Sequence, residues 1–405
     1  MLKKLIFLAI IIQSFAIQAQ PAHRKLIYIQ DKDIETGAEQ ISSWSAKVQG
    51  KRIGLVAHAS SYINETHLVD SMLSLDMNLV KVFAPEHGFR GTASAGAKIE
   101  DEKDPKTGLP IISLYGSNKK PKAEQLKDID IMLFDLQDVG VRFYTYLSTL
   151  HYVMQACAEN NIPLIILDRP NPNGYYTAGP ILRPEYASFV GMHPIPVVHG
   201  NTLGEMANMI NGEGWLGEGL SCDFEVIAVK GYERRMIYEL PRKPSPNLPT
   251  KESVYMYPSL CFFEGTDVSV GRGTDYPFQV YGAPFLMGSF QFVPEDREGA
   301  MNPKWEGKVC YGEHLGQFAQ NQFSNPRNLY LRYLVKAHYR HQRMGIEKPF
   351  FNTFFDKLAG TDELRLRIQA GQTQEQILAA WEPMLKAYRT KRKQYLIYPW
   401  SAPKN

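Results

Sequence analysis

"IDIMLFDLQD" (residues 129–138) is a run of apolar, mostly branched side chains that ends abruptly in acidic and amide groups. Three further runs have the same build: "RIGLVAHAS" (52–60), "NLVKVFAPE" (78–86) and "NIPLIILDRP" (161–170). The segments 65–77 and 144–159 between them carry apolar residues at helical spacing. Continuous apolar strands that alternate with amphipathic helices are typical of a parallel sheet covered by helices. The sequence therefore predicts an α/β fold built on a parallel sheet.

Polar side chains follow each of these four predicted strands. They are His58 after the first, Glu86 and His87 after the second, Asp135 and Asp138 after the third, and Asp168 and Arg169 after the fourth. The carboxyl ends of parallel strands meet at one edge of an open α/β sheet, and that edge forms the ligand crevice. We therefore expect the functional site at this edge.

The first twenty residues have the build of a secretory signal peptide. Lys3 and Lys4 precede an apolar stretch from Leu5 to Ile12, and small residues follow near Ala19. The apolar stretch is short for a membrane span, and no later segment is long and uncharged enough for one. We expect residues 1–20 to direct export, with a periplasmic mature chain that has no membrane span.

Composition and motifs argue against several classes of protein. The formal net charge of +3 is small for 405 residues, whereas a nucleic-acid binder carries a stronger and more clustered positive charge. The four cysteines are far apart and form no C-x-x-C pair, so we expect isolated, mostly buried thiols instead of zinc ligands. The chain has no P-loop, no H-E-x-x-H motif and no G-x-G-x-x-G after its first strand. We expect no metal centre and no cofactor.

The second half of the chain has a different pattern. "LPRKPSPNLPTKES" (240–253) carries four prolines and is typical of an extended crossing between domains. The glycines and aromatic residues of segment 262–285 indicate a functional loop. Short strands such as "NLYLRYLVKA" (328–337) are expected to alternate with helices after it. We therefore predict an α/β domain over 21–258 and a smaller α+β domain over 259–405 that completes a cleft.

Glu86 is the first candidate for catalysis. It lies in "PEHG" (85–88), where Pro85 fixes one backbone angle and Gly88 permits another. A carboxylic acid that is partly shielded from water can keep a proton long enough to donate it. We predict that Glu86 is catalytic and that His87 and Arg90 bind the ligand. A turn carboxylate that only accepts bonds from backbone amides is the competing explanation.

Other segments add acids, cations and tyrosines, a mixture that suits a hydroxyl-rich ligand. The candidates are Asp138, Arg142 and Tyr144 in "FDLQDVGVRFYTY" (134–146); Asp168, Arg169 and Asn171 in "LDRPNPNG" (167–174); His199; and Glu264, Arg272 and Thr274 in the glycine-rich loop. A structural ion-pair network and a simple Asn-Gly turn are alternatives for the first two segments.

Taken together, these segments resemble the bacterial exo-β-N-acetylmuramidase family of NamZ type, formerly a family of unknown function. The motifs that carry the resemblance are "FAPEHGFRG", "TGLPIISLYG", "FDLQDVGVRFYTY", "LDRPNPNG", "GPIL", "FVGMHPIPVVHGNTLGEMA" and "EGTDVSVGRGTDYPF". They are spread in order over nearly the whole chain after about Ile53, which makes their combination far more specific than any one motif.

The resemblance implies a glycoside hydrolase that removes N-acetylmuramic acid (MurNAc) from the non-reducing end of peptidoglycan fragments. It also implies a Rossmann-like domain joined to a smaller domain, with the active site between them. Glycoside cleavage commonly uses one carboxyl group as acid and a second as base or nucleophile. We expect Glu86 to be the acid and Asp138, or else Glu264, to be the second group. The candidates for binding the lactyl carboxylate of MurNAc are Arg272, Arg142 and Arg169.

Two other functions are compatible with the same residues. One is an exported protein that binds a sugar or muropeptide between two lobes without chemistry. The other is an esterase or deacetylase that acts on the same polymer.

Overall fold

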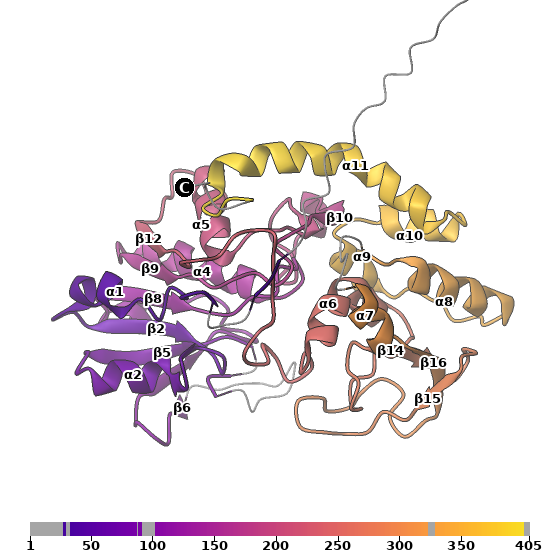
Figure 1. Cartoon of the computed structure of the whole chain (residues 1–405), viewed down its shortest axis with the longest axis horizontal. Helices are drawn as coiled ribbons and strands as arrows, with labels where there is room; N and C mark the ends of the chain where they lie inside the picture. Colours follow the sequence, from indigo (N-terminus) through magenta and orange to yellow (C-terminus); the bar gives the residue numbers. More distant parts are fainter. Residues whose placement is uncertain (1–26, 30–32, 87, 91–101, 323–328, 401–405) are drawn as a thin grey trace, which may run out of the picture.

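The computed structural model describes residues 27–29, 33–86, 88–90, 102–322 and 329–400. A seven-stranded sheet forms the centre of the N-terminal half (Figure 1), with the strand order β12-β9-β8-β2-β5-β7-β6. Its strands are β2 (Ile53–Ala57), β5 (Leu79–Ala84), β6 (Glu102–Lys103), β7 (Pro110–Ser113), β8 (Ile131–Asp135), β9 (Leu164–Leu167) and β12 (Phe224–Ile227). All neighbours are parallel except the edge pair β6 and β7. The predicted Rossmann-like α/β fold is confirmed.

Helices cover both faces of this sheet, which is why its central strands are apolar throughout. The helices of this half are α1 (Ile41–Val48), α2 (Leu68–Ser74), the short α3 (Ala123–Leu126), α4 (Tyr146–Glu159) and α5 (Leu203–Gly212). Leu55 of β2 belongs to one apolar cluster with residues of α1 and α2, whereas Val56 belongs to another with residues of α4 and α5. Successive side chains of a strand point to opposite faces, so both need apolar partners.

The order of the strands creates a topological switch point at β2. The chain runs outward from β2 to β5 and β7, and then returns to β8, β9 and β12 on the other side of β2. Loops after strands on either side of a switch point diverge and leave a crevice at the carboxyl edge of the sheet. His58, Glu86 and Asp138 follow β2, β5 and β8 at that edge, as predicted.

The second half is a smaller α+β unit. Its antiparallel sheet has the order β14-β16-β15, formed by β14 (Val280–Ala283), β15 (Phe290–Phe292) and β16 (Cys310–His314). Its helices are α6 (Lys251–Leu260), η3 (Cys261–Gly265), α7 (Gly316–Gln322), α8 (Arg332–Arg343), α9 (Thr353–Ala359), α10 (Glu363–Gln369), α11 (Gln374–Lys391) and η4 (Arg392–Tyr395). The remaining elements are β1 (Ile27–Ile29), β3 (Tyr62–Ile63), β4 (Thr66–His67), β10 (Ala178–Ile181), η2 (Pro184–Tyr186), β11 (Pro196–Val198) and β13 (Met236–Tyr238).

The predicted strand at 328–337 is wrong, because most of that segment belongs to helix α8. The buried side chains Leu334, Ala337 and His341 recur every three or four residues, which is the period of a helix with one face on the core. A short apolar run alone does not distinguish a strand from a buried helix.

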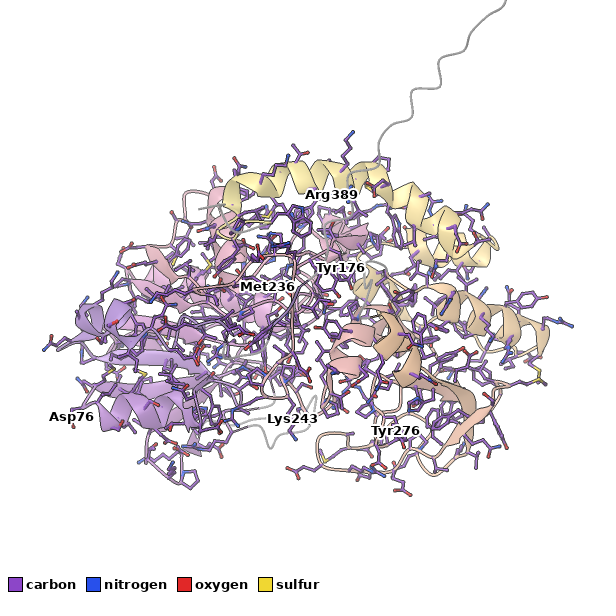
Figure 2. The ribbon with its side chains drawn as sticks, viewed as in Figure 1. Asp76, Tyr176, Met236, Lys243, Tyr276 and Arg389 are labelled. Carbon is purple, nitrogen blue, oxygen red and sulfur yellow. The ribbon has the colours of Figure 1, made fainter. Side chains whose placement is uncertain are left out.

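The C-terminal segment ties the two halves together. Helix α11 runs from the second unit back over the first (Figure 1), and Figure 2 shows Arg389 of this helix above Tyr176 of the N-terminal half. Beyond it, the Tyr398 hydroxyl donates to Asp168 Oδ2 at 2.6 Å, and the Tyr398 amide donates to Glu205 Oε1 at 3.1 Å. The division at residue 258 stays a prediction, and Tyr398, far along the second half, contacts the first domain.

Three further predictions concern the cysteines, a membrane span and the export signal. All four cysteines are buried and free, as predicted. Among the helices of the described residues, none combines the length and the apolar composition that crossing a membrane requires. Residues 1–20 lie outside the described part of the chain, so the expected export signal stays a prediction.

Candidate active site

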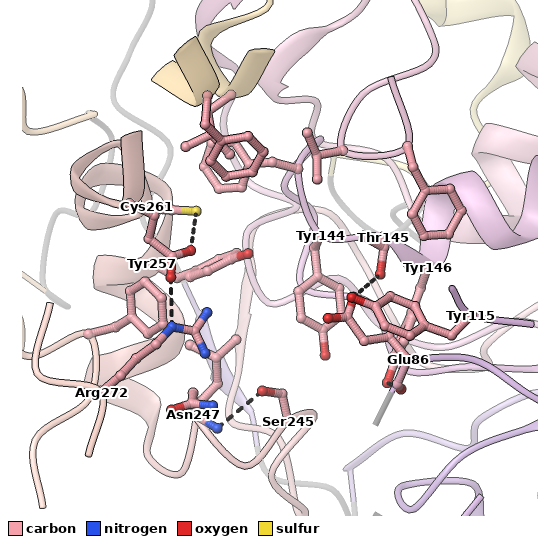
Figure 3. A pocket seen from close by; sticks show the side chains of 18 residues that line it. Glu86, Tyr115, Tyr144, Thr145, Tyr146, Ser245, Asn247, Tyr257, Cys261 and Arg272 are labelled. Carbon is pink, nitrogen blue, oxygen red and sulfur yellow. Dashed lines mark hydrogen bonds and ion pairs between the residues drawn. The ribbon is translucent and has the colours of Figure 1, made fainter. Parts of the chain in front are cut away.

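A cavity of about 210 Å³ lies between the two halves, and residues of both halves line it. Figure 3 shows Glu86, Tyr115, Thr145 and Tyr146 on one side, with Tyr257, Cys261 and Arg272 facing them. Ser245 and Asn247, from the predicted crossing segment, form part of the floor in this view. The chain thus brings side chains from the strand ends and from the glycine-rich loop into one hollow.

Glu86 enters this cavity from the turn after β5. The Thr145 hydroxyl donates a hydrogen bond to Glu86 Oε2 at 2.9 Å. Tyr115, which follows β7, lies beside the same carboxylate. Burial, together with the charge and hydrogen bonding of Glu86, raises the pKa of Tyr115 to about 12. The Tyr115 hydroxyl therefore keeps its proton at neutral pH and presents a donor to the carboxylate.

Residues after β2 and β8 hold the backbone of Glu86. The Tyr146 hydroxyl lies 3.4 Å from the main-chain oxygen of Glu86 and 3.3 Å from His58 Nδ1. His58 Nε2 accepts a hydrogen bond from the Gln137 amide at 2.9 Å, so the ring hydrogen is on Nδ1 and points to Tyr146. Tyr146 can then donate to Glu86. The ends of β2, β5, β7 and β8 consequently converge on one glutamate.

The opposite wall carries an ion pair. Arg272 Nε donates to Glu264 Oε1 at 2.6 Å, and the Arg272 guanidinium lies 5.0 Å from the centroid of the Phe278 ring. Burial lowers the pKa of Arg272, but the charge and hydrogen bond of Glu264 raise it by more, so the pKa of Arg272 lies above its ordinary value. Among the described residues, no protein group accepts a hydrogen bond from the two terminal nitrogens of Arg272. They are available to a ligand in the cavity.

Glu86, Tyr144, Glu264 and Arg272 are the predicted site residues that line this cavity. Asp138 and His199 do not. Asp138 Oδ1 accepts from the Gly140 amide at 2.6 Å, and burial raises the pKa of Asp138 to about 7. His199 Nδ1 accepts from the Asn201 amide at 3.2 Å, and burial lowers the pKa of His199 to about 3. The Asp138 side chain thus holds the loop that follows β8 and carries Thr145, whereas the His199 side chain holds the turn after β11.

Two predicted arginines are also occupied within the protein. Arg142 is 1% exposed and donates to four main-chain oxygens, those of Pro180, Ile195, Leu358 and Ala359, at 2.6–3.1 Å. Arg169 donates to both carboxylate oxygens of Asp135, at 2.5 and 2.9 Å. The last two partners of Arg142 end helix α9, so its guanidinium joins the two halves. Of the three arginines proposed for the lactyl carboxylate, only Arg272 faces the cavity.

The other predicted residues lie in the framework. Asp168 accepts from Thr202, Gly204 and Tyr398, and burial raises its pKa to about 6. Three more have partners outside the cavity: Asn171 binds Asn201, Thr274 binds the Gly271 carbonyl, and Arg90 binds Asp104. His87 lies outside the described residues, and its role stays a prediction.

Sequence reasoning missed Tyr115, Thr145, Ser245, Asn247 and Cys261. Tyr115 lies near the end of the run "IISLYG", and Thr145 directly follows Tyr144, a predicted site residue. Position at a strand end was therefore the available signal for both. Ser245 and Asn247 lie in a proline-rich segment with no such signal. Within the described residues no cluster of three His, Cys, Asp or Glu side chains suits a metal ion.

The chain is similar to proteins of known family over most of its length. Residues 53–252 match the family model described as exo-β-N-acetylmuramidase NamZ, N-terminal, and residues 255–398 match the corresponding C-terminal model. The peptidoglycan β-N-acetylmuramidase NamZ of Bacillus subtilis is 39% identical over 388 residues, which cover 90% of this chain and 91% of that protein.

Two crystal structures have the same fold. Both are of DUF1343 family proteins from Bacteroides fragilis NCTC 9343. One is 42% identical with a TM-score of 0.82 and is matched over 91% of this chain and 99% of its own. The other is 29% identical with a TM-score of 0.76, over 90% of this chain and 99% of its own.

Proposed function

Because the chain belongs to the exo-β-N-acetylmuramidase NamZ family, we propose that it releases terminal MurNAc from the non-reducing end of peptidoglycan fragments such as MurNAc-GlcNAc. As a member of this family it is a glycosidase, and peptidoglycan supplies its substrate. The observation that carries the detailed proposal is the cavity between the two halves, with Glu86 on one wall and Arg272 on the other.

Glu86 is the general acid in this proposal. Cleavage of a glycosidic bond leaves charge on the departing oxygen unless a carboxyl group protonates it as the bond breaks. Glu86 faces the cavity and is held by hydroxyl groups and by its own backbone contact to Tyr146. These contacts support a fixed direction of proton transfer, which general acid catalysis requires.

Glu264 is the preferred second carboxylate, as base or nucleophile. It lines the cavity across from Glu86, whereas Asp138 is turned into the framework. Arg272 balances the charge of Glu264, so this carboxylate can remain in a site that also admits an anionic sugar.

Arg272 gives the site its preference for MurNAc. This sugar differs from N-acetylglucosamine by a lactyl carboxylate, and a guanidinium can bind a carboxylate through two parallel hydrogen bonds. The terminal nitrogens of Arg272 are the donors. Tyr144, Tyr257 and Phe278 line the same cavity and offer aromatic surface to the sugar ring.

We place the barrier that restricts the enzyme to chain ends on the side of the second unit. Phe354 and Leu358 of helix α9 contribute to the wall on the side of the second unit. A polymer cannot pass through such a wall, so only a terminal sugar fits. We also propose that residues 1–20 direct export to the periplasm, where peptidoglycan fragments arise. Fractionation of cells that produce the full chain and a chain without residues 1–20 tests this part.

Incubation of the purified protein with MurNAc-GlcNAc, followed by mass spectrometry of the products, tests the function. Free MurNAc and free N-acetylglucosamine are the expected products. Recovery of the intact disaccharide would indicate a binding protein, and release of acetate or lactate would indicate the esterase or deacetylase alternative. Either of these two results contradicts the proposal.

A further inference from the structure

Thr145 occupies an unusual position for a threonine at the start of a helix. It is the N-cap residue of α4, yet its side chain makes no capping hydrogen bond. An N-cap threonine usually accepts a hydrogen bond from a backbone amide of the first turn, and this bond stabilises the helix. The Thr145 hydroxyl instead donates to Glu86 Oε2 at 2.9 Å, as the dashed line in Figure 3 shows.

We propose that Thr145 is a positioning residue for catalysis by Glu86, an inference that rests on the proposed function. The Thr145 hydroxyl holds carboxyl oxygen Oε2 of Glu86 and so fixes the orientation of the carboxyl group toward the glycosidic oxygen of the substrate. Thr145 acts through Glu86, because its own hydroxyl points to the carboxylate.

The contact strengthens as the reaction proceeds. Glu86 starts as a carboxylic acid, transfers its proton to the departing oxygen and becomes a carboxylate as the bond between that oxygen and the anomeric carbon breaks. A hydroxyl that donates to a carboxylate forms a stronger hydrogen bond than one that donates to a neutral carboxyl group. An interaction that is stronger in the transition state than in the ground state raises kcat.

The start of a helix reinforces the effect. Backbone amides at a helix N-terminus favour negative charge nearby, and the Glu86 carboxylate is bonded to Thr145, the N-cap residue of the 14-residue helix α4. Thr145 therefore couples the carboxylate to the end of a helix that is itself fixed on the central sheet. Loss of the hydroxyl removes this link without removing the helix.

Three variants separate positioning from a structural role. Thr145→Val removes the hydroxyl but keeps the shape, and Thr145→Ser keeps the hydroxyl. Thr149→Val is the matched control, because Thr149 is buried one turn further along the same helix, where its hydroxyl donates to the Thr145 carbonyl at 3.3 Å and not to Glu86. The assay measures kcat and KM on a chromogenic β-muramide across the pH range, with circular dichroism as the check of folding.

We expect Thr145→Val to lower kcat by about ten- to a hundredfold, the range for loss of a hydrogen bond to a charged group, with KM changed less than about twofold. A carboxyl group that loses a donor keeps its proton to higher pH, so the limb of the pH profile that Glu86 controls moves to higher pH. Thr145→Ser restores most of the activity, and Thr149→Val resembles the wild type. An unchanged kcat and profile in Thr145→Val, or equal losses in all three variants, would overturn the inference.

A second readout does not depend on turnover. In protein labelled with carboxyl-¹³C glutamate, the Glu86 signal is the one that Glu86→Gln lacks, and we expect its titration to move to higher pH in Thr145→Val. A wild type that releases no MurNAc overturns the proposed function. A titration that Thr145→Val leaves unmoved overturns the role of Thr145 specifically.

Discussion

Replacement of Arg142 by methionine should weaken the join between the two halves of the protein. The Arg142 guanidinium is fully buried, and its partners are four main-chain oxygens, two from the N-terminal half and two from the end of helix α9. Phe354 and Leu358 of that helix line the cavity. Methionine fills a similar volume but donates to none of the four oxygens, although Ile195 O keeps a hydrogen bond from the Leu182 amide at 3.2 Å.

The size of the effect follows from two opposing contributions. Hydrogen bonds to a charged group stabilise by about 1.5–3 kcal/mol each, so four of them contribute about 6–12 kcal/mol. Burial lowers the pKa of Arg142 to about 9, and a difference of this size from the ordinary arginine value corresponds to about 5 kcal/mol against the buried charge. Subtracting the cost of burial from the contribution of the hydrogen bonds leaves a loss of about 1–7 kcal/mol, with a middle value of about 4 kcal/mol. This value agrees with the loss of about 3–5 kcal/mol that is usual when a buried charged contact is broken.

Urea unfolding followed by tryptophan fluorescence measures this loss. Arg183→Met is the matched control, because Arg183 also faces the second unit, at 3.3 Å from Asp362 and 3.5 Å from Glu363, but its side chain is 48% exposed. An exposed ion pair contributes about 1 kcal/mol or less. A free energy of unfolding for Arg142→Met within about 1 kcal/mol of the wild type would refute the reasoning, because the four bonds would then contribute no net stability.

Two further predictions concern the carboxylates and the substrate. Burial raises the pKa of Asp138 to about 7, above the value of about 4 in an unfolded chain. The folded state therefore holds a proton that the unfolded state releases, and this contribution to stability is lost as the pH rises from about 4 to 7. Between pH 4 and pH 8 the free energy of unfolding of Asp138→Asn, measured with urea, should rise by up to about 4 kcal/mol relative to that of the wild type. Free energies of unfolding that change in parallel with pH in the two proteins would contradict this expectation. The variant should also keep most of its hydrolase activity. Arg272→Met should lower kcat/KM on a chromogenic muramide by about a hundredfold more than on the matching glucosaminide, as expected for loss of a bidentate charged contact. Loss of the ion pair with Glu264 affects both substrates alike, so an unaltered ratio between the two sugars would exclude Arg272 from lactyl recognition.

The sheet was predictable because its signal is local. The runs that became β2, β5, β8 and β9 are apolar on both faces, and the segment that became α4 has helical spacing. The period of a short run is less informative, and the apolar residues around Leu334 were assigned to a strand although they form the buried face of α8. The smaller α+β unit was expected, but its individual elements were not.

The site was predictable only as a region. Sequence position places Asp135, Glu86 and Arg169 at the same edge of the sheet, but it does not say which side chains face a ligand. Asp135 ends β8 and Arg169 follows the adjacent β9, so the two bind each other instead. Arg142 looked like a ligand for a carboxylate, yet its partners are main-chain oxygens up to 217 residues away. Such long-range contacts leave no pattern in the sequence.

Glu86→Gln offers the most direct test of the catalytic site. Glutamine keeps the shape of the side chain and its contact with Thr145, but it has no proton of suitable acidity to transfer. We expect a folded variant with the unfolding curve of the wild type that releases MurNAc from a chromogenic muramide at least about a hundredfold more slowly, as for the loss of general acid catalysis. Near-normal turnover by folded Glu86→Gln would contradict the assignment of this cavity, and of Glu86 within it, as the site of hydrolysis.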